Sequence, residues 1–259
     1  MLSYQHAYHA GNMADVHKHA ILAWILEYMT RKDKPLTYME THAGRGLYDV
    51  TDEMAAKTGE AAQGIAIARK WFAADHPYAL ALDKVNADHG PNAYPGSPMV
   101  AAHVLRPSDP LFLTELHPQE FGHLRENMKP HAAICQQRDG WEMALSQCPP
   151  DPRRGMLLID PSFEVKTDYE TIPDTIRKIN RKWSVGVIAL WYPILTDAPH
   201  LPMTRALKRN HPDALCHEVH FPPARAGHRM VGSGMFVINP PYGLEEEGKW
   251  LSNQFRKLL

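Results

Sequence analysis

Apolar residues recur along the chain with two different periods, and the changes between them predict the order of the elements. A period near 3.6 over residues 13–31 predicts an amphipathic helix with Val16, Ala20, Ala23 and Trp24 on one stripe and Asn12 as its N-cap. Short apolar runs that end at turn residues predict strands at residues 36–39, 111–116, 132–136, 156–159, 185–190, 215–221 and 235–238. Helical spacing between these runs predicts helices at residues 98–105, 118–128, 141–146, 168–181, 203–210 and 244–258.

This alternation of strands and helices predicts an α/β fold with helices on both faces of a sheet. The last two strands have no clear helix between them, so we expect them to form a closing hairpin. A seven-stranded, mixed, Rossmann-like sheet with a reversed last strand fits this order. Residues 50–92 are rich in Ala and carry no strand pattern. We therefore divide the chain into a main domain, residues 1–49 and 94–259, and a helical insertion, residues 50–93.

Composition limits the class of protein further. The chain has 259 residues and a formal net charge of −1, which indicates one large domain and excludes a strongly basic nucleic-acid-binding domain. Cys135, Cys148 and Cys216 form no C-x-x-C pair, so neither a disulfide scaffold nor a cysteine zinc site is expected. No segment reaches the roughly 20 apolar residues that span a bilayer, and the start lacks the basic region of a signal peptide. We expect a cytoplasmic protein without a membrane partner, and a monomer by default.

Basic residues are concentrated between residues 176 and 230, although the whole chain is nearly neutral. Nine Lys and Arg residues stand there against Asp197, Asp213 and Glu218: Arg177, Lys178, Arg181, Lys182, Arg205, Lys208, Arg209, Arg225 and Arg229. Such a local excess could form a face that follows a phosphate backbone. Solvated helix faces would give the same pattern, so the cluster alone does not decide between them.

A glycine turn follows the first predicted strand. In Glu40-Thr-His-Ala-Gly-Arg-Gly46 an acidic residue precedes G-x-G at the place where open α/β sheets bind ligands. The third glycine of the dinucleotide fingerprint is missing, which argues against NAD and FAD. An acidic residue here suits a cofactor with a positive amino group, such as S-adenosylmethionine. An ordinary β-turn is equally consistent with this motif taken alone.

The second motif is Leu157-Leu-Ile-Asp-Pro-Ser-Phe163, in which an apolar strand delivers a carboxylate, a rigid turn and an aromatic ring to one edge. It is similar to the [D/N/S]-P-P-[Y/F/W] motif of enzymes that methylate exocyclic amines of bases. The N6 lone pair of adenine is delocalised, so N6 is a poor nucleophile. Asp160 and the Pro161 carbonyl could accept the two N6 hydrogens, and Asp160 could then take the released proton. Phe163 would stack on the extruded base, or it is simply a core residue after a proline turn.

A second segment, Ile238-Asn-Pro-Pro-Tyr242, matches N-P-P-Y letter for letter. It also follows an apolar strand. In the predicted sheet, however, it ends the last strand near the edge, whereas the strand before Asp160 lies beside the first strand and its glycine turn. We therefore prefer Asp160 and interpret Asn239 as part of a structural turn.

Histidines are dense at the start of the chain, at His6, His9, His17 and His19. Metal-binding helices usually place ligands at i,i+4, and no H-E-x-x-H is present. Because His17 and His19 would face different sides of a helix, we expect no metal site. Neutral imidazoles that form hydrogen bonds, or surface positions, are the preferred interpretations.

Taken together, these segments resemble the RlmJ family, the bacterial 23S ribosomal RNA adenine N6-methyltransferases. The start of the chain carries the matching Leu2-Ser-Tyr4, His6, His9-Ala-Gly-Asn12, Ala14-Asp15 and Lys18-His19. Further matches follow in family order: Thr41-His-Ala-Gly44, Tyr94-Pro-Gly-Ser-Pro98, Leu113-Thr-Glu-Leu-His-Pro118, Asp139-Gly140, Arg153-Arg-Gly155, Leu158-Ile-Asp-Pro161, Lys166-Thr-Asp-Tyr169, Ala189-Leu-Trp-Tyr-Pro193 and Gly234-Met235 with Val237-Ile-Asn-Pro-Pro241. They extend along nearly the whole chain.

The resemblance implies a Rossmann-like class I S-adenosylmethionine-dependent methyltransferase with a small helical insertion after the first strand. It implies that six residues bind the cofactor: His19, His42, Ser97, Glu115, Asp139 and Gly140. Glu115 would take the ribose hydroxyls, and Asp139 and Gly140 would hold the adenine. Asp160 would be the catalytic proton acceptor, and Tyr4 and Phe163 would contact the RNA. The implied substrate is one adenine of 23S ribosomal RNA, position 2030.

The chain departs from the family in one motif. Members commonly have D-P-P-Y, whereas this chain has Ser162 and Phe163 after Asp160-Pro161. Phe163 keeps a stacking face, so we expect activity to survive. Two alternatives stay open: a methyltransferase of another amine, in DNA adenine or protein, and a non-catalytic RNA-binding or ribosome-assembly protein.

Overall fold

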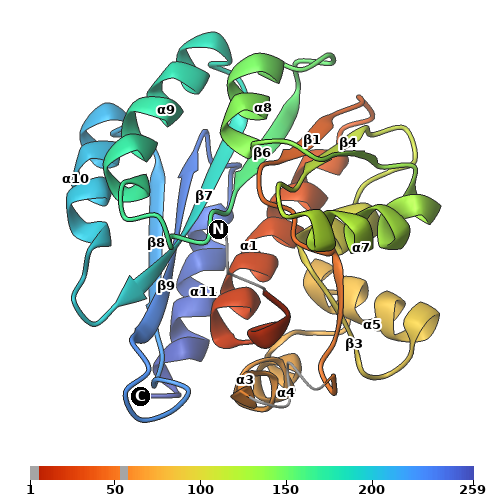
Figure 1. Cartoon of the computed structure of the whole chain (residues 1–259), viewed down its shortest axis with the longest axis vertical. Helices are drawn as coiled ribbons and strands as arrows, with labels where there is room; N and C mark the ends of the chain where they lie inside the picture. Colours follow the sequence, from red (N-terminus) through yellow and green to blue (C-terminus); the bar gives the residue numbers. More distant parts are fainter. Residues whose placement is uncertain (1–5, 53–57) are drawn as a thin grey trace.

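The computed structural model describes residues 6–52 and 58–259 (Figure 1). Its main sheet has seven strands in the order β5-β4-β1-β6-β7-β9-β8. These strands are β1 (Thr37–Glu40), β4 (Leu111–Thr114), β5 (Ile134–Gln136), β6 (Gly155–Ile159), β7 (Val187–Leu195), β8 (Leu215–His220) and β9 (Met230–Ile238). The first five pair in parallel, whereas β9 runs antiparallel to both β7 and β8. The predicted mixed sheet, its closing hairpin and its reversed last strand are confirmed.

The strands at the centre of the sheet are apolar on both faces because helices cover both. In β6, Met156 and Leu158 belong to the core on one face, and Leu157 and Ile159 belong to the core on the other. Strand β6 pairs directly with β1, with Leu158 opposite Glu40. The carboxyl ends of β1 and β6, and the turns that follow them, therefore lie next to each other, as the sequence predicted.

Two layers of helices enclose the sheet. One layer contains α1 (Met13–Thr30), α6 (Ser97–Val104), α7 (Pro118–Met128) and α11 (Leu244–Arg256). The other contains α8 (Gly140–Gln147), α9 (Asp168–Lys182) and α10 (His200–Asn210), which Figure 1 shows grouped on one side of the sheet. Short 3-10 turns lie at His6–Tyr8, Arg69–Trp71 and Lys129–His131. Within the described residues, no helix is long and apolar enough to cross a membrane.

Helix α1 begins where the sequence predicted, because Asn12 caps it: its side-chain oxygen accepts from the backbone N–H of Asp15 at 2.9 Å. The prediction of an amphipathic helix was wrong. Polar residues Asp15, His17, Lys18 and His19 are as buried as the apolar stripe. The reason is that α1 is covered on several sides, by the sheet, by α6 and by α11 (Figure 1). Its polar side chains must therefore find partners inside the protein.

The segment between β1 and α6 is mainly helical. A two-stranded antiparallel ribbon, β2 (Leu47–Asp49) and β3 (Ala93–Pro95), encloses it. The described part contains α3 (Glu60–Gln63), α4 (Ile65–Ala68) and α5 (Pro77–His89). Tyr78 and Leu82 of α5 join the same core as α1. The division of the chain into a main domain and an insertion at residues 50–93 stays a prediction.

The Asn-Pro-Pro-Tyr turn lies at the amino ends of the parallel strands, whereas Asp160 lies at their carboxyl ends. We expected β9 near the edge of the sheet, but it lies between β7 and β8, and β8 is the edge strand. Because β9 is antiparallel, it ends where the parallel strands begin. Asn239 there donates from Nδ2 to the carbonyls of Ser184 and Gly186, at 2.9 and 2.8 Å, and its φ is 54°. Its role is to hold the start of β7.

The basic cluster of residues 176–230 is divided by the fold. Arg181 and Lys182 end α9, and Lys208 and Arg209 end α10, where positive charge stabilises the negative end of the helix dipole. Arg177 and Lys178 pair with Asp174. Only Arg225 and Arg229 lie on the loop after β8, at the carboxyl edge. The cluster therefore forms no single continuous face.

Replacing Asn239 by Ala should lower the free energy of unfolding by about 2 kcal/mol, because two carbonyls lose their donor and Ala disfavours a positive φ. Asn239→Gly should lose less, since glycine adopts that φ freely. Urea unfolding of both variants measures the two effects. An Ala variant as stable as the unaltered protein would contradict this account of the turn.

Candidate functional site

A cavity of about 600 Å³ opens at the carboxyl edge of the sheet. The segments that follow β1, β4, β5 and β6 line it together with the second half of β7, and the start of α1 closes one side. This is the edge where open α/β sheets bind ligands. The volume lies within the range of about 300–1,000 Å³ that small-molecule and cofactor sites occupy.

The turn after β1 is built for close approach. Gly44 has φ 59°, and a Cβ atom there would lie 2.5 Å from the Tyr48 hydroxyl, so a larger residue would not fit. The Gly44 N–H donates to Glu115 Oε2 at 2.8 Å. His42, two residues earlier, lines the cavity, and burial lowers its pKa to about 4, so its imidazole is neutral at pH 7. Its ring packs edge-on against Trp141.

Glu115 stands at the end of β4. Its carboxylate accepts from the backbone N–H groups of Gly44 and His117, each at 2.8 Å. Burial raises the pKa of Glu115, and the hydrogen bonds from His117 and Gly44 oppose that shift. The backbone of Leu116 also bonds to this carboxylate. A carboxylate has about four lone-pair positions, so acceptor capacity remains for a hydroxyl group of a ligand.

Asp139 and Gly140 begin α8 beside the same cavity. Asp139 is the N-cap, and its Oδ1 accepts from the N–H groups of Trp141 and Glu142 at 2.8 and 3.0 Å. A Cβ atom on Gly140 would meet the Thr41 carbonyl oxygen at 2.1 Å. Since that oxygen is backbone and cannot move away cheaply, glycine is needed for α8 to approach the turn after β1.

His19 presents a ring nitrogen that has no hydrogen-bond partner among the described residues; the nearest carboxylate oxygen, Asp15 Oδ1, lies 3.9 Å away. Its Nδ1 lies 3.0 Å from the Tyr94 hydroxyl, whereas Nε2 is buried without a hydrogen bond. Burial lowers the pKa of His19 to about 3, so the ring is neutral. His19 lines the cavity. A buried, unsatisfied nitrogen at a cavity wall is a place where a ligand atom can complete the hydrogen bonding.

Ser97 lines the cavity at the start of α6, and its hydroxyl donates to Glu40 Oε1. The other carboxylate oxygen of Glu40 accepts from the Tyr38 hydroxyl at 2.8 Å. Glu40 itself is fully buried and lies behind Ser97, outside the cavity lining. The acid before G-x-G therefore lies one side chain behind the cavity wall, where it holds Ser97. Burial raises the pKa of Glu40 to about 8.

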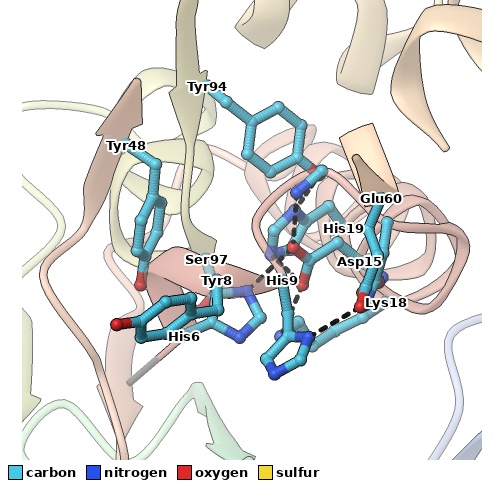
Figure 2. Close-up of polar contacts among 12 residues, drawn as sticks. His6, Tyr8, His9, Asp15, Lys18, His19, Tyr48, Glu60, Tyr94 and Ser97 are labelled. Atoms are coloured by element: carbon cyan, nitrogen blue, oxygen red, sulfur yellow. Dashed lines mark hydrogen bonds and ion pairs between the residues drawn. The ribbon is translucent and has the colours of Figure 1, made fainter. Parts of the chain in front are cut away.

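A chain of charged groups ends at Asp160, which follows β6. Lys18 Nζ donates to Asp160 Oδ2 at 2.7 Å and lies 3.2 Å from Asp15 Oδ1. His6 Nε2 lies 2.8 Å from Asp15 Oδ2, on the side that Figure 2 shows facing Tyr48. Burial would lower the pKa of Lys18, but Asp160 and Asp15 raise it above its ordinary value. Lys18 is thus a permanent cation between two carboxylates.

Asp15 holds this arrangement from the first turn of α1. Burial would raise the pKa of Asp15, but His6, Lys18 and His19 together lower it well below its ordinary value. Its Oδ2 also accepts from the Gly11 N–H at 2.9 Å. The carboxylate is therefore ionised and fixed. Because Asp15 is held in place by its other partners and lies 3.2 Å from Lys18 Nζ, Lys18 has little freedom to move away from Asp160.

Aromatic rings form the wall beyond Asp160. Phe163 has φ 55°, and its ring lies 4.7 Å from Tyr169 and 6.2 Å from Trp191, measured between centroids. Phe163 and Trp191 both line the cavity, and the Lys18 ammonium lies 5.4 Å from the centre of the Trp191 ring. The Phe163 and Trp191 rings meet edge to face, at 65°. An aromatic corner with a carboxylate beside it can take a planar heterocycle with an amino group.

The structure brings most of the predicted site residues to one cavity. His19, His42, Ser97, Glu115, Asp139, Gly140, Asp160 and Phe163 all line it. Tyr4 lies outside the described residues. Among the described residues, no group of three or more His, Cys, Asp or Glu side chains could hold a metal ion. Instead of binding metal, His9 Nδ1 lies 3.0 Å from Glu60 of α3, as Figure 2 shows.

Three residues of this site had no predicted role: Asp15, Lys18 and Trp191. One signal in the sequence could have found the first two. Polar residues interrupt an otherwise apolar helix on several sides, which excludes a solvated stripe and implies buried partners. Trp191 gave no such signal, because an aromatic residue inside an apolar strand is ordinary.

Comparison with known proteins now adds a family. Residues 33–258 match the family described as "Ribosomal RNA large subunit methyltransferase D, RlmJ". The Ribosomal RNA large subunit methyltransferase J of Escherichia coli (strain K12) is 39% identical over 254 residues, which cover 95% of this chain and 90% of that protein. The protein of the same name from Haemophilus influenzae (strain ATCC 51907 / DSM 11121 / KW20 / Rd) is 36% identical over 267 residues, covering 100% and 94%. The crystal structure of protein LPL1258 from Legionella pneumophila str. Philadelphia 1 superposes with a TM-score of 0.86 at 35% identity, over 96% of this chain and 94% of that one.

The pKa of Glu40 predicts how stability changes with pH. Folded Glu40 keeps its proton up to about pH 8, whereas the unfolded chain releases it near its ordinary value of 4.5. The native state binds more protons in this interval, so the contribution of Glu40 to stability falls as the pH rises. Glu40→Gln removes this titration. The variant should therefore gain stability relative to the unaltered protein from pH 5 to pH 8, with an upper limit of roughly 4 kcal/mol.

Urea unfolding of both proteins at several pH values measures this difference. Histidines that titrate in the same range cancel, because both proteins contain them. A constant difference between pH 5 and pH 8 would show that Glu40 is ionised throughout.

Proposed function

The chain belongs to the RlmJ family of ribosomal RNA large subunit methyltransferases, and on this premise we propose that it methylates N6 of one adenine in 23S ribosomal RNA. It is a methyltransferase of ribosomal RNA, and its cofactor is S-adenosylmethionine. The observation that carries the finer proposal is Asp160, held by Lys18 at the end of β6, beside an aromatic corner. Position 2030 is proposed from the resemblance of the sequence alone.

The cavity lining fits the proposed cofactor. S-adenosylmethionine supplies an electrophilic methyl group on a sulfonium centre. We assign the ribose hydroxyls to Glu115, whose carboxylate has lone pairs left. Asp139 and Gly140 would hold the adenine at the start of α8. His19, with its unsatisfied Nε2, and His42 and Ser97 would contact the remainder.

Asp160 is the proposed proton acceptor. The carboxylate oxygen opposite the Lys18 contact, Oδ1, would accept one N6 hydrogen, and the Pro161 carbonyl would accept the other. These two bonds turn the nitrogen lone pair out of the ring plane and toward the methyl group. As the N–C bond formed, the bond between the methyl group and the sulfonium sulfur would break, its electron pair would stay on the sulfur, and the N6 proton would pass to Asp160. Lys18 is the group that keeps Asp160 oriented while the substrate is absent.

Phe163 and Trp191 are the proposed walls for the extruded base. A target base must leave its helix to reach an enclosed site, and an aromatic corner offsets part of the lost stacking. Phe163 needs no hydroxyl for this role, which explains how Phe can stand where relatives of this motif have Tyr. Lys166 and Arg225, on the exposed loops after β6 and β8, are the proposed contacts to phosphate at the mouth.

Asp160→Asn tests the chemistry directly. The variant keeps the shape of the side chain and one acceptor oxygen but cannot take the proton. We expect kcat for methyl transfer to fall by roughly 10²- to 10⁴-fold, with little change in the Kd for S-adenosylmethionine. The assay uses labelled S-adenosylmethionine and 23S ribosomal RNA that lacks its adenine modification, followed by digestion and identification of the labelled nucleoside.

Asn239→Ala is the matched control, because Asn239 carries the better match to N-P-P-Y but lies at the other edge of the sheet. It should retain methyl transfer at a temperature where it is folded. An active Asp160→Asn together with an inactive, folded Asn239→Ala would overturn the assignment of the site. Label in a nucleoside other than N6-methyladenosine, or in protein or DNA only, would overturn the proposed substrate.

A further inference from the structure

A row of buried polar groups runs from the wall of the cavity through the core to α11. Trp191 Nε1 donates to Ser233 Oγ at 2.9 Å, and the same oxygen lies 2.9 Å from Nδ1 of His17. His17 Nε2 lies 2.8 Å from Nδ1 of His217, and His217 Nε2 lies 2.8 Å from Ser252 Oγ. The row joins β7, β9, α1, β8 and α11, five elements that are distant in the sequence.

These groups lie deep in the protein. His17 and Ser233 are 0% exposed, and His217 is 9% exposed. Apolar side chains at the same positions would avoid the cost of burying polar groups. A buried polar row is stable only when each member has its partner, and it then fixes one geometry. The row therefore stabilises a particular orientation of its members, and Trp191 is the member that reaches the cavity.

The direction of the hydrogen bonds follows from the outer end of the row. At the cavity end, the Trp191 indole can only donate, so Ser233 Oγ accepts from it and still has its own hydrogen to donate. At the outer end, His217 is hydrogen-bonded to the backbone of Gly248, whose carbonyl can only accept. The proton of His217 is therefore on Nε2. His17 therefore carries its proton on Nε2 and donates it to His217 Nδ1, and the Ser233 hydroxyl donates to His17 Nδ1.

This assignment requires both imidazoles to be neutral. Burial, followed by the neighbouring His217, lowers the pKa of His17 well below its ordinary value, and burial also lowers the pKa of His217. A second proton on His217 would place two N–H groups against each other between the rings, and a second proton on His17 would point at the Ser233 hydroxyl hydrogen. The row is thus a single one-way hydrogen-bond chain at neutral pH.

Helix α11 locks the outer end of the chain. A Cβ atom on Gly248 would lie 2.9 Å from Cδ2 of the His217 ring, so glycine lets α11 approach this ring closely. Phe255, one of the largest fully buried residues, packs edge-on against His17. Neither ring can turn without moving α11.

At the cavity end, the row of hydrogen bonds holds the indole ring of Trp191. Trp191 faces Phe163 at 6.2 Å, and the ammonium of Lys18, which holds Asp160, lies 5.4 Å from its centre. Lys18 follows His17 directly in α1, so the same helix turn sets both the carboxylate and the indole. The angle between the ring and Asp160 depends on the hydrogen bond to Ser233.

We propose that His17, Ser233 and His217 are positioning residues for methyl transfer, and that their hydrogen-bond chain holds the Trp191 indole as the fixed wall against which the target base lies. This inference rests on the proposed function, because it needs a planar base beside Asp160. The chain acts through Trp191 and touches neither cofactor nor substrate. Its loss should leave cofactor binding intact and misplace the base.

The first test reads the indole itself. Protein with ¹⁵N-labelled tryptophan gives one indole N–H signal from each of its six Trp residues, and Trp191→Phe assigns the one from Trp191. His217→Leu removes a member that is three hydrogen bonds away from the indole. We expect the Trp191 signal to shift and its N–H to exchange faster with solvent. His217→Asn keeps an acceptor at the Nδ1 position and should restore both.

The second test reads catalysis in the same variants. His217→Leu should lower kcat/KM for 23S ribosomal RNA by about tenfold, since a small misplacement of the reacting group is enough for such a loss. The Kd for S-adenosylmethionine should not change. His217→Asn should recover most of the activity. Ser233→Ala, a smaller change next to the indole, gives the same test if His217→Leu does not fold.

His211→Leu is the matched control for lost stability. His211 is a histidine with the same exposure as His217, 9%, but it ends α10 on the other face of the sheet. It should leave both the Trp191 signal and kcat/KM unchanged. A His217→Leu variant with a shifted signal and full activity would overturn the inference. So would equal losses in His217→Leu, His217→Asn and His211→Leu, which would show general destabilisation. Absence of methyl transfer by the unaltered protein would instead overturn the proposed function, and with it any role for this chain.

Discussion

The buried ion pair between Lys18 and Asp160 joins the first helix to the middle of the sheet, and much of the site depends on it. A lysine this buried is stable only beside carboxylates, and removing one partner would leave an uncompensated charge in the interior. Asp15 supplies the second carboxylate, so the cation is held from both sides. The pair fixes α1 across the carboxyl edge of the sheet and closes the cavity on that side.

Three consecutive residues of α1 serve three different parts of the molecule. Successive side chains of a helix point about 100° apart. His17 points into the core toward β8 and β9, Lys18 points to Asp160, and His19 points to Tyr94 and the cavity. A helix at the surface could not do this. Because α1 is enclosed, each of these side chains meets a different element. One turn of the helix therefore contacts the core, the Asp160 carboxylate and the part of the cavity beside Tyr94.

The two Pro-containing motifs show how far local sequence can mislead. Asn239-Pro-Pro-Tyr is the closer match to the motif of base-methylating enzymes, yet its amide only holds the backbone at Ser184 and Gly186. Asp160-Pro-Ser-Phe163 is the poorer match but lies in the cavity. What separates them is strand direction, since the antiparallel β9 delivers its turn to the edge without a site. A motif of this kind can act in catalysis only when its strand ends at the carboxyl edge of the sheet, where the cavity lies.

Resemblance to a family indicated most of the residues that line the cavity, whereas the sequence by itself determined the alternation of elements, the closing hairpin and the cap at Asn12. These follow from local causes: apolar periodicity, turn residues, and glycines at positions such as Gly44 and Gly140 where backbone approaches backbone. Only the tertiary structure decided the partners of the buried polar residues. Glu40 lies behind Ser97 rather than in the cavity, and Lys18 pairs with Asp160. Trp191 begins a row of hydrogen bonds that ends at Ser252, 61 positions further along the sequence. Such pairs join residues up to 216 positions apart. The hydrophobic period or residue spacing of one segment contains no information about which distant segment will pack against it.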